Sequence, residues 1–203
     1  NDHTTPYAEI PRSYKIEISE GHLATVVADC IVYKYGVPKT HEINHFTFLK
    51  DEGKWQMLSV SFTVKPVPDD QKDFDLVIFA RSYARAWGSK RANYVASYFS
   101  EQGSLQVNDA KPSLGRSEIA VTAQSFMTKF PDMNVRFDKL ERTSKGIEFH
   151  WTLTGTDADP KGKGHKVKVS GYELWTLSDN GRIKVSMGNF PSDEYNRQLE
   201  FGI

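Results

Sequence analysis

The sequence predicts an α+β protein whose strands and helices are segregated along the chain. Three observations lead to this class. Residues 14–64 alternate apolar and polar side chains, residues 71–130 carry apolar side chains at helical spacing, and residues 163–190 alternate again. A period of two is typical of half-buried strands, whereas recurrence every three or four residues is typical of amphipathic helices. Runs of strands next to runs of helices favour α+β over α/β.

The first part of the chain is expected to form a strand meander. Residues 1–13 contain two prolines and no periodicity, which predicts an irregular lead-in. Short turn signals such as Asp51-Glu52-Gly53 then separate strands that we expect to be antiparallel and in sequence order. The four expected strands span residues 14–18, 22–35, 40–50 and 55–64, and a stiff polar linker follows at 66–70.

The second part is expected to begin with helices. Apolar residues at helical spacing predict an amphipathic helix over 71–87 and a short one over 91–99. A third helix, 115–130, is ended by Pro131. Strands are expected at 104–107, 135–142 and 146–156. The chain closes with a helical turn from Pro191, where Ser192 and the acidic residues after it offer N-terminal capping chemistry.

Residues 163–190 are predicted to form a long β-hairpin. The turn is Asp179-Asn180-Gly181, because Asn and Gly accept positive φ at little cost. Alternation places Glu173 in mid-strand on the same side as Val169 and Trp175. A carboxylate at this position is either on an exposed sheet face, paired with Arg182 or Lys184, or in a pocket where it is chemically useful. The residues alone leave both interpretations open.

Composition limits the class of partner. The 26 Lys and Arg balance the 26 Asp and Glu, so no bulk field favours nucleic acid or a membrane surface. Cys30 is the one cysteine, which excludes an intramolecular disulfide. No apolar run approaches the ~20 residues that a spanning helix needs. We expect a soluble protein, cytoplasmic rather than secreted. The start at Asn1, without Met or a signal-like segment, is consistent with a processed form or a fragment.

The two hairpin regions resemble each other, which suggests an internal repeat. Residues 41–62 superpose on 168–190 when the glycines of the two turns are aligned. The matched pairs are Leu49 with Leu177, Asp51 with Asp179, Lys54 with Arg182, Phe62 with Phe190 and His45 with Glu173. A lone meander has one apolar face to cover. We expect that face to pack on the sheet of the complete domain, on a partner chain or on an N-terminal segment absent from this chain.

The order of elements, with GRSEIAVTAQSFMTKFPD and GHKVKVSGYELWTLSDNGRIKVSMGNF followed by EYNRQL, resembles the SnoaL-like (polyketide cyclase-like) branch of the nuclear transport factor 2-like superfamily. The resemblance covers about residues 71–200. It implies a cone-shaped fold in which three helices pack in a curved antiparallel sheet around an apolar pocket. Residues 71–203 are then a complete SnoaL-like domain, and residues 1–66 a partial domain of the same fold, its last four strands only.

The resemblance also implies candidate chemistry. Members include cyclases, dehydratases, ketosteroid isomerases and epoxide hydrolases, and also pockets without a known reaction, so both an enzyme and a non-catalytic binding or dimerisation module remain open. SnoaL-like cyclases carry a catalytic carboxylate on the strand before the last hairpin turn. Glu173 lies near that position, one methylene longer than the usual Asp. Such a carboxylate moves a proton next to a carbonyl and needs no metal or cofactor.

Further residues are candidates for the same site. His150 is a candidate proton shuttle, with a solvated or core histidine as the alternative. Aromatic and sulfur-bearing side chains that line a pocket, or simply fill the core, are Tyr83, Trp87, Tyr94, Phe126, Trp151, Trp175 and Met187. His41 and His45 lie about 13 Å apart on one strand, too far for shared metal ligation. The expected partners are a small apolar molecule and a second copy or an intrachain pseudo-dimer joined through the sheets, with no nucleic acid and no membrane.

Overall fold

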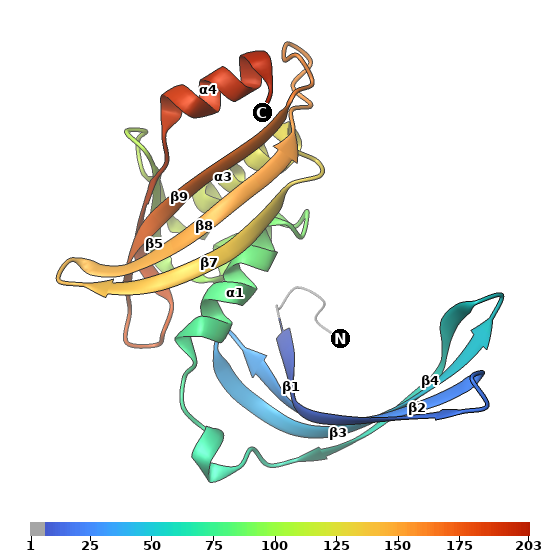
Figure 1. The fold of residues 1–203 in the computed structure, drawn as a ribbon. Helices are drawn as coiled ribbons and strands as arrows, with labels where there is room; N and C mark the ends of the chain where they lie inside the picture. The colour runs from blue at the N-terminus through green and yellow to red at the C-terminus, as the bar shows by residue number, and fades with distance from the viewer. Residues whose placement is uncertain (1–6) are drawn as a thin grey trace. The chain divides into compact units, whose positions relative to one another are not determined.

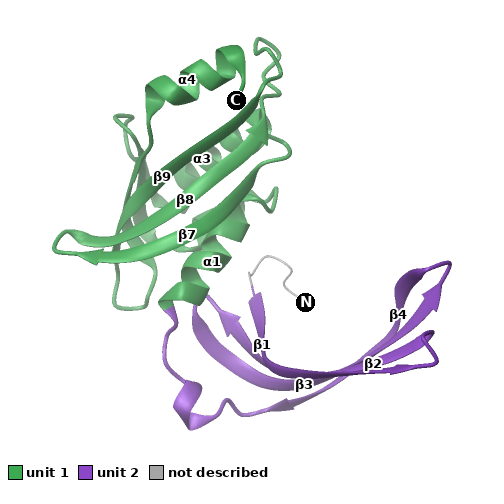
Figure 2. Ribbon diagram, in the orientation of Figure 1, with its two compact units in different colours: residues 1–6, 76–203 green, residues 7–75 purple. Residues whose placement is uncertain are grey.

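The computed structural model describes residues 7–203 and divides the chain into two compact units, Tyr7–Asp75 and Leu76–Ile203 (Figure 2). Each unit has a sheet of its own. That the first unit is part of a second domain of the same fold stays a prediction. No helix within residues 7–203 has the length and apolar character needed to cross a membrane.

The first unit is an antiparallel meander, as predicted. Its sheet has the order β1-β2-β3-β4, with η1, a 3₁₀ turn at Asp69–Gln71, after the last strand (Figure 1). The strands are β1 (Tyr7–Ser19), β2 (Leu23–Lys34), β3 (Val37–Asp51) and β4 (Lys54–Lys65). The irregular lead-in predicted for 7–13 is wrong, because β1 begins at Tyr7. Pro11 is accommodated on this edge strand beside a register shift between Pro11 and Ser13. Residues 1–6 lie outside the described residues.

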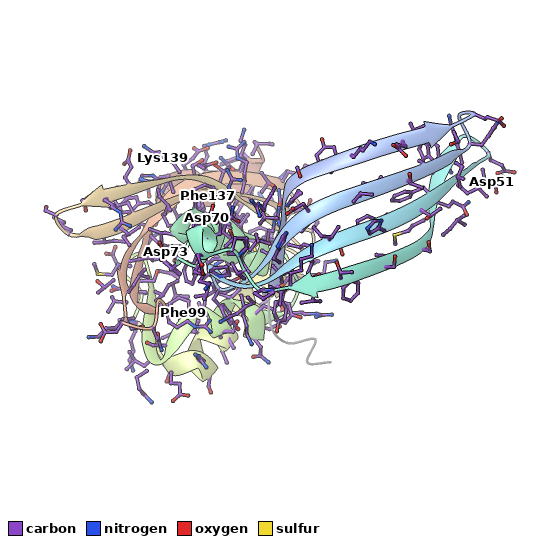
Figure 3. The ribbon with its side chains drawn as sticks, turned by 90° about the horizontal axis from the view of Figure 1, so that it is seen from below. Asp51, Asp70, Asp73, Phe99, Phe137 and Lys139 are labelled. Atoms are coloured by element: carbon purple, nitrogen blue, oxygen red, sulfur yellow. The ribbon has the colours of Figure 1, made fainter. Side chains whose placement is uncertain are left out.

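The β1–β4 sheet has one apolar and one polar face. Cross-strand register places Ile16, Val26, Phe46 and Val60 in one row across all four strands. The row on the opposite face, one residue along, is Lys15, Val27, His45 and Ser61. We call the first side the apolar face; its large exposed side chains are Tyr14, Ile16, Ile18, Met57, Val60, Phe62 and Val64. Figure 3 shows side chains standing along this sheet as far as the turn at Asp51.

The second unit surrounds a six-stranded sheet of order β6-β5-β10-β9-β8-β7 (Figure 1). Its helices are α1 (Leu76–Trp87), α2 (Ala92–Ser97), α3 (Gly115–Lys129) and α4 (Ser192–Phe201). Its strands are β5 (Phe99–Val107), β6 (Ser113–Leu114), β7 (Asn134–Thr143), β8 (Gly146–Thr156), β9 (Lys166–Leu177) and β10 (Ile183–Asn189).

The sheet is mixed, which corrects the fully antiparallel expectation. β5 runs parallel to β10, and its register shifts between the pairs Ile183–Phe99 and Val185–Ser104. This irregularity interrupts alternation over residues 100–103, which is why the sequence indicated a strand only from Ser104. Gly103 lies in the irregular stretch, and a Cβ there would come within 2.9 Å of the Ile183 carbonyl oxygen. The close backbone approach therefore requires glycine.

The core lies between the sheet and the helices α1 and α3. Apolar residues recur one turn apart on α1 as Phe79 and Tyr83 and on α3 as Ile119 and Ala123, and all four are buried. Figure 1 shows α3 behind the β8 and β9 strands and α1 beside β7. The centre is aromatic: Trp175 is fully buried and stacks on Phe149 of the neighbouring strand with ring centroids 4.6 Å apart.

Helix α4 is longer than the predicted turn and is attached to the sheet by Gln198. The backbone N–H of Lys168 donates to Gln198 Oε1 (2.6 Å), and Gln198 Nε2 donates to the Lys168 carbonyl (3.0 Å). The expected side-chain cap is absent from this helix: Pro191 is its N-cap residue and makes no capping hydrogen bond. Asp193 and Glu194 nevertheless place acidic groups in the first turn, where they stabilise the helix by interacting with its dipole.

Candidate functional site

Glu173 is a buried carboxylate in the middle of β9, with 6% of its surface exposed. Three donors from three elements converge on its Oε2 atom. Ser186 Oγ on β10 donates over 2.6 Å, Trp175 Nε1 on β9 over 2.9 Å and Tyr83 Oη on α1 over 3.0 Å. Among residues 7–203, the remaining oxygen, Oε1, has a single contact, with Tyr83 Oη at 3.4 Å. The carboxylate is therefore anchored through one oxygen, and the other is lightly used.

The alternative in which Glu173 pairs at the surface with Arg182 or Lys184 is wrong. Glu173 is buried, and the Arg182 guanidinium donates instead to the backbone oxygen of Ser97 over 2.6 Å. The strand direction explains the difference, because Glu173 shares the inward side of β9 with the buried Val169 and Trp175.

Burial and the three donors act on the Glu173 carboxyl in opposite directions. Removal from water raises its pKa, and the hydrogen bonds from Ser186, Trp175 and Tyr83 lower it in part. The pKa remains above the ordinary value for a glutamate. Burial, together with the nearby Glu173 charge, raises the pKa of Tyr83 well above its ordinary value, so Tyr83 stays a protonated donor at neutral pH. A buried carboxyl with a raised pKa is suited to taking up and returning a proton.

An apolar pocket opens beside this carboxylate. It contains about 50 Å³ of space that water can occupy, within about 480 Å³ of empty volume counted out to its mouth. The inner space holds only a few water molecules, so a large ligand would require the walls to move. The pocket is lined by Trp87, Leu105, Val107, Phe126, Val135, Trp151, Leu153, Glu173, Gly188 and Phe190.

The aromatic candidates fall into three groups. Some line this pocket, some contact the Glu173 carboxylate, and one lies on the outer surface. Trp87, Phe126 and Trp151 line the pocket. Tyr83 and Trp175, also predicted to line the pocket, are instead fully buried behind it and donate to the Glu173 carboxylate. All of them face the core. Helical spacing predicts this for the residues on helices, and strand alternation predicts it for those on strands.

Two of the predicted pocket residues lie elsewhere, and this corrects their assignment. Tyr94 is on α2, where its hydroxyl accepts a hydrogen bond from Arg91 Nη1 over 2.5 Å. Met187, on β10, pairs with Leu174 of β9 and is 45% exposed. It follows the inward-facing Ser186 and so points to the opposite face. Strand alternation turns Met187 away from the pocket.

Sequence reasoning missed Ser186, which donates to the Glu173 carboxylate. It also missed the pocket-lining residues Leu105, Val107, Val135, Leu153, Gly188 and Phe190. Ser186 lies opposite Trp175 in the β9–β10 pairing, while Gly188 lies opposite Glu173. A register shift between Ile183 and Val185 determines which β10 side chains face inward. No pattern in the sequence marks this shift. Alternating side chains along β10 from the turn at residues 179–181 therefore could not place Ser186 against Glu173.

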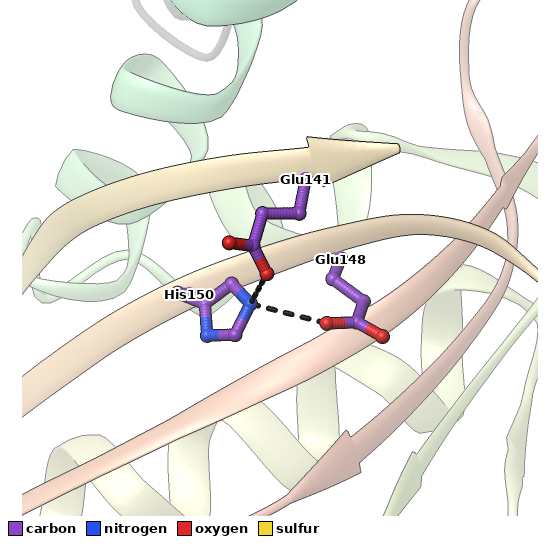
Figure 4. Close-up of side chains that lie close together, drawn as sticks. All are labelled: Glu141, Glu148 and His150. Atoms are coloured by element: carbon purple, nitrogen blue, oxygen red, sulfur yellow. Dashed lines mark hydrogen bonds and ion pairs between the residues drawn. The ribbon is translucent and has the colours of Figure 1, made fainter. Parts of the chain in front are cut away.

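His150 lies on the opposite face of the sheet from Glu173, which corrects its role as a proton shuttle for that carboxylate. Phe149 is the residue of β8 that lies opposite Glu173, so His150 falls beside Tyr172 on the outer face. Figure 4 shows His150 Nε2 between two carboxylates, 3.3 Å from Glu141 Oε2 and 3.2 Å from Glu148 Oε2.

The ligating atoms of Glu141, Glu148 and His150 lie within 4.8 Å of one another, the spacing of potential metal ligands. A neighbouring cation already balances part of their charge, because Lys139 Nζ pairs with Glu141 over 2.5 Å.

In the first unit, His41 Nε2 pairs with Asp29 over 3.0 Å. His45 lies on the polar face of the β1–β4 sheet, so its equivalence to the buried Glu173 is wrong. The two turns differ in length: Asp51 pairs with Lys54, but Leu177 pairs with Ile183.

The curved mixed sheet packed around helices is the nuclear transport factor 2-like fold, and in this chain it holds a buried carboxylate beside an apolar pocket. The sequence profile of the SnoaL-like domain matches residues 80–186, more than half of the chain. This chain belongs to the SnoaL-like domain family. No curated protein matches the chain by sequence.

Solved structures with the same fold confirm the fold class. A protein with a ketosteroid isomerase-like fold from Catenulispora acidiphila, solved in complex with trimethylamine, has 16% identity and a TM-score of 0.52, over 61% of this chain and 92% of its own. TsrD from Streptomyces laurentii has 14% identity and a TM-score of 0.53, over 63% and 98%. A protein described as a SnoaL-like polyketide cyclase from Jannaschia sp. CCS1 has 14% identity and a TM-score of 0.50, over 59% and 89%. At these identities the likeness concerns the fold.

Proposed function

We propose that the chain is a SnoaL-like enzyme of the cyclase, isomerase or dehydratase type, in which Glu173 transfers a proton on a small apolar carbonyl compound without a cofactor. The observation that carries the proposal is the unequal use of the two carboxylate oxygens. Oε2 accepts three hydrogen bonds at 2.6–3.0 Å, which fixes the group, and Oε1 has one contact at 3.4 Å. A fixed base with one available oxygen beside an apolar pocket suits abstraction of a proton next to a carbonyl.

The reaction begins with the ionised Glu173. Oε1 takes a proton from the carbon beside the carbonyl, and the electrons of the broken C–H bond form an enolate. The protonated Glu173 then returns the proton to another carbon, which gives isomerisation, or to a departing hydroxyl group, which gives dehydration. Cyclisation follows if the enolate carbon attacks a second carbonyl of the same molecule, and the alkoxide so formed takes the proton back from Glu173. Tyr83, Trp175 and Ser186 keep the carboxylate in position through each step.

Exchange of carbon-bound protons tests the role of Glu173. We expect the protein to catalyse α-proton exchange of cyclohexanone in D₂O, followed by proton NMR. Glu173→Gln is expected to lower the enzyme-dependent rate by about 10²–10⁴-fold, the usual contribution of a general base. Glu148→Gln, on the outer face, is the matched control and is expected to keep the rate. Equal rates for the wild type and Glu173→Gln would exclude the mechanism.

A second candidate function, dimerisation, is favoured by the apolar face of the first unit. Seven large apolar side chains there are 51–66% exposed. They leave on the order of 700 Å² of apolar surface, close to the about 800 Å² that each partner buries in a standard interface. Contiguous patches of this size mark interaction sites. We propose a second copy of this chain as the occupant, because the surface is large enough for a stable dimer.

Light scattering coupled to size exclusion tests this interface. The wild type is expected to elute as a dimer, and Phe62→Asp, which puts a charge on the apolar face, is expected to elute as a monomer. Ser61→Asp is the matched control, because Ser61 is the next residue of the same strand and faces the polar side. A monomeric wild type, or equal masses for Phe62→Asp and the wild type, would contradict the interface.

A further inference from the structure

Trp151 has a buried indole N–H without a hydrogen-bond acceptor among residues 7–203. The side chain lies on β8, opposite Gly171 of β9, and lines the same pocket as Glu173. A Cβ at position 171 would come within 2.8 Å of Trp151 Cζ2, so the glycine makes room for the indole. Phe190 packs edge-on against the ring, with centroids 6.1 Å apart. The indole is therefore held in place by packing and not by a hydrogen bond.

An unpaired buried donor is unfavourable and uncommon. Burying an N–H without an acceptor forfeits the hydrogen bond that it made with water, and most buried polar groups in proteins are paired. A donor of this kind in the wall of a pocket is explained if a ligand supplies the missing acceptor.

The other polar side chains of the pocket wall are already engaged within the protein. Trp87 packs edge-on against the Tyr83 ring, with centroids 6.3 Å apart, and Tyr83 in turn donates to Glu173. Glu173 Oε2 accepts three hydrogen bonds, which leaves Oε1 as the lightly used acceptor. Trp151 Nε1 is the buried donor of the pocket wall that has no acceptor among residues 7–203. An apolar wall with one free donor and one lightly used carboxylate oxygen complements a small molecule with one acceptor and one proton to give.

We infer that the Trp151 indole N–H binds the carbonyl oxygen of the ligand, and that the pocket selects small, neutral, enolisable carbonyl compounds. The inference rests on the proposed function, since it names the group that would hold the oxygen while Glu173 takes the proton. Negative charge develops on that oxygen in the enolate, where a fixed donor in an apolar site is most effective. A hydrocarbon of the same shape would leave the donor unpaired and bind more weakly.

Two probes of matched shape test the inference: cyclohexanone, which has an acceptor, and methylenecyclohexane, which does not. The chain has four tryptophans, so a ¹⁵N–¹H spectrum contains four indole signals, and Trp151→Phe identifies the relevant one. Cyclohexanone is expected to move the Trp151 indole proton downfield, and methylenecyclohexane is expected to leave it near its free position. Trp55, in the other unit, serves as the internal reference.

Affinities from the same titrations complete the test. Trp151→Phe is expected to weaken cyclohexanone binding about three- to tenfold, the usual value of one hydrogen bond, and to leave methylenecyclohexane binding unchanged. Retained hydrocarbon binding shows that the variant pocket is intact. Equal affinities of the wild type for the two probes, or no binding of either, overturns the inference.

Failure of the proposed function would look different. The titrations are repeated with Glu173→Gln, which keeps Trp151. Downfield movement of the Trp151 signal with unchanged proton exchange in Glu173→Gln would support the donor role and refute the catalytic carboxylate. Loss of exchange in Glu173→Gln without any response of Trp151 would do the reverse.

Discussion

The β7–β10 strands and the β1–β4 strands are both antiparallel meanders in sequence order, and they differ in what lies on their apolar sides. In the first, helix α1 packs against β7, and β5, which continues the sheet beyond β10, packs against helix α3. The second ends at β4, all of whose residues are exposed. A covered sheet can bury a carboxylate such as Glu173 and shape a pocket, whereas an open sheet offers a surface. The same strand order therefore builds an enclosed pocket in one unit and an open apolar surface in the other.

Removal of an aromatic ring from each sheet should produce the largest difference. Phe149 is fully buried between Trp175 and Phe137, and Phe62 is 60% exposed on β4. Phe149→Ala is expected to lower the free energy of unfolding by about 3–5 kcal/mol, because it removes buried contacts and leaves a cavity. Phe62→Ala is expected to change it by about 0.5 kcal/mol or less at low protein concentration. Urea unfolding followed by circular dichroism measures both.

A loss at Phe62 as large as that at Phe149 would show that the apolar face is already covered in the single chain. A loss that grows with protein concentration would instead support the second copy as the cover, because association stabilises by mass action.

The pH dependence of stability should separate the covered carboxylate from the exposed ones. Burial raises the pKa of Glu173 above its unfolded value, so the folded chain holds its proton more tightly. The sign follows from linkage: stability from this group is complete below the unfolded pKa and declines as the pH rises through the folded pKa. Glu173→Gln is neutral at every pH. It is expected to gain stability relative to the wild type as the pH rises, by about 1.4 kcal/mol for each unit by which the pKa is raised.

Unfolding in urea across pH 4–8 provides this comparison. Glu148→Gln, on the outer face, serves as the control. A difference between Glu173→Gln and the wild type that is constant with pH would mean that the carboxyl has the same pKa in the folded and unfolded chain.

The smallest expected effect concerns the reactivity of Cys30, which lies in the first unit's sheet. Its thiol is on the apolar face of β2 and is 4% exposed, and burial raises its pKa. A buried thiol with a raised pKa reacts slowly, because the thiolate is the nucleophile. Modification by an aromatic disulfide reagent is expected to be slower than in the urea-unfolded chain and to slow further as protein concentration rises. Independence of concentration would count against association through this face.

Much of the fold follows from local patterns in the sequence. Strand alternation and the turn at Asp179-Asn180-Gly181 predict the β9–β10 hairpin, and helical spacing predicts α1 and α3. The same alternation places Glu173 beside Trp175 on one side of β9. These features depend on residues close together in the chain, which is where periodicity is informative.

The remaining features depend on register between distant strands. Whether Phe149 or His150 lies opposite Glu173 depends on the β8–β9 pairing, and the Ser186 contact depends on a register shift in β10. The parallel addition of β5 and the extension of β1 past Pro11 are likewise decided by packing and bulges. A shift of one residue in the register moves every side chain of a strand to the other face of the sheet, and no local sequence pattern predicts that shift.

The paired hydrogen bonds between Gln198 and the Lys168 backbone have a consequence for aggregation. β10 pairs with β9 as far as the match of Asn189 with Tyr172, so in the described part of the chain the first residues of β9 have no strand neighbour on that side. Unpaired strand edges act as templates for other chains. The Gln198 amide offers one donor and one acceptor to Lys168, as a neighbouring strand residue would, and thereby closes the edge to an incoming strand. Helix α4 thus occupies the position at this edge where a strand from another chain would otherwise pair.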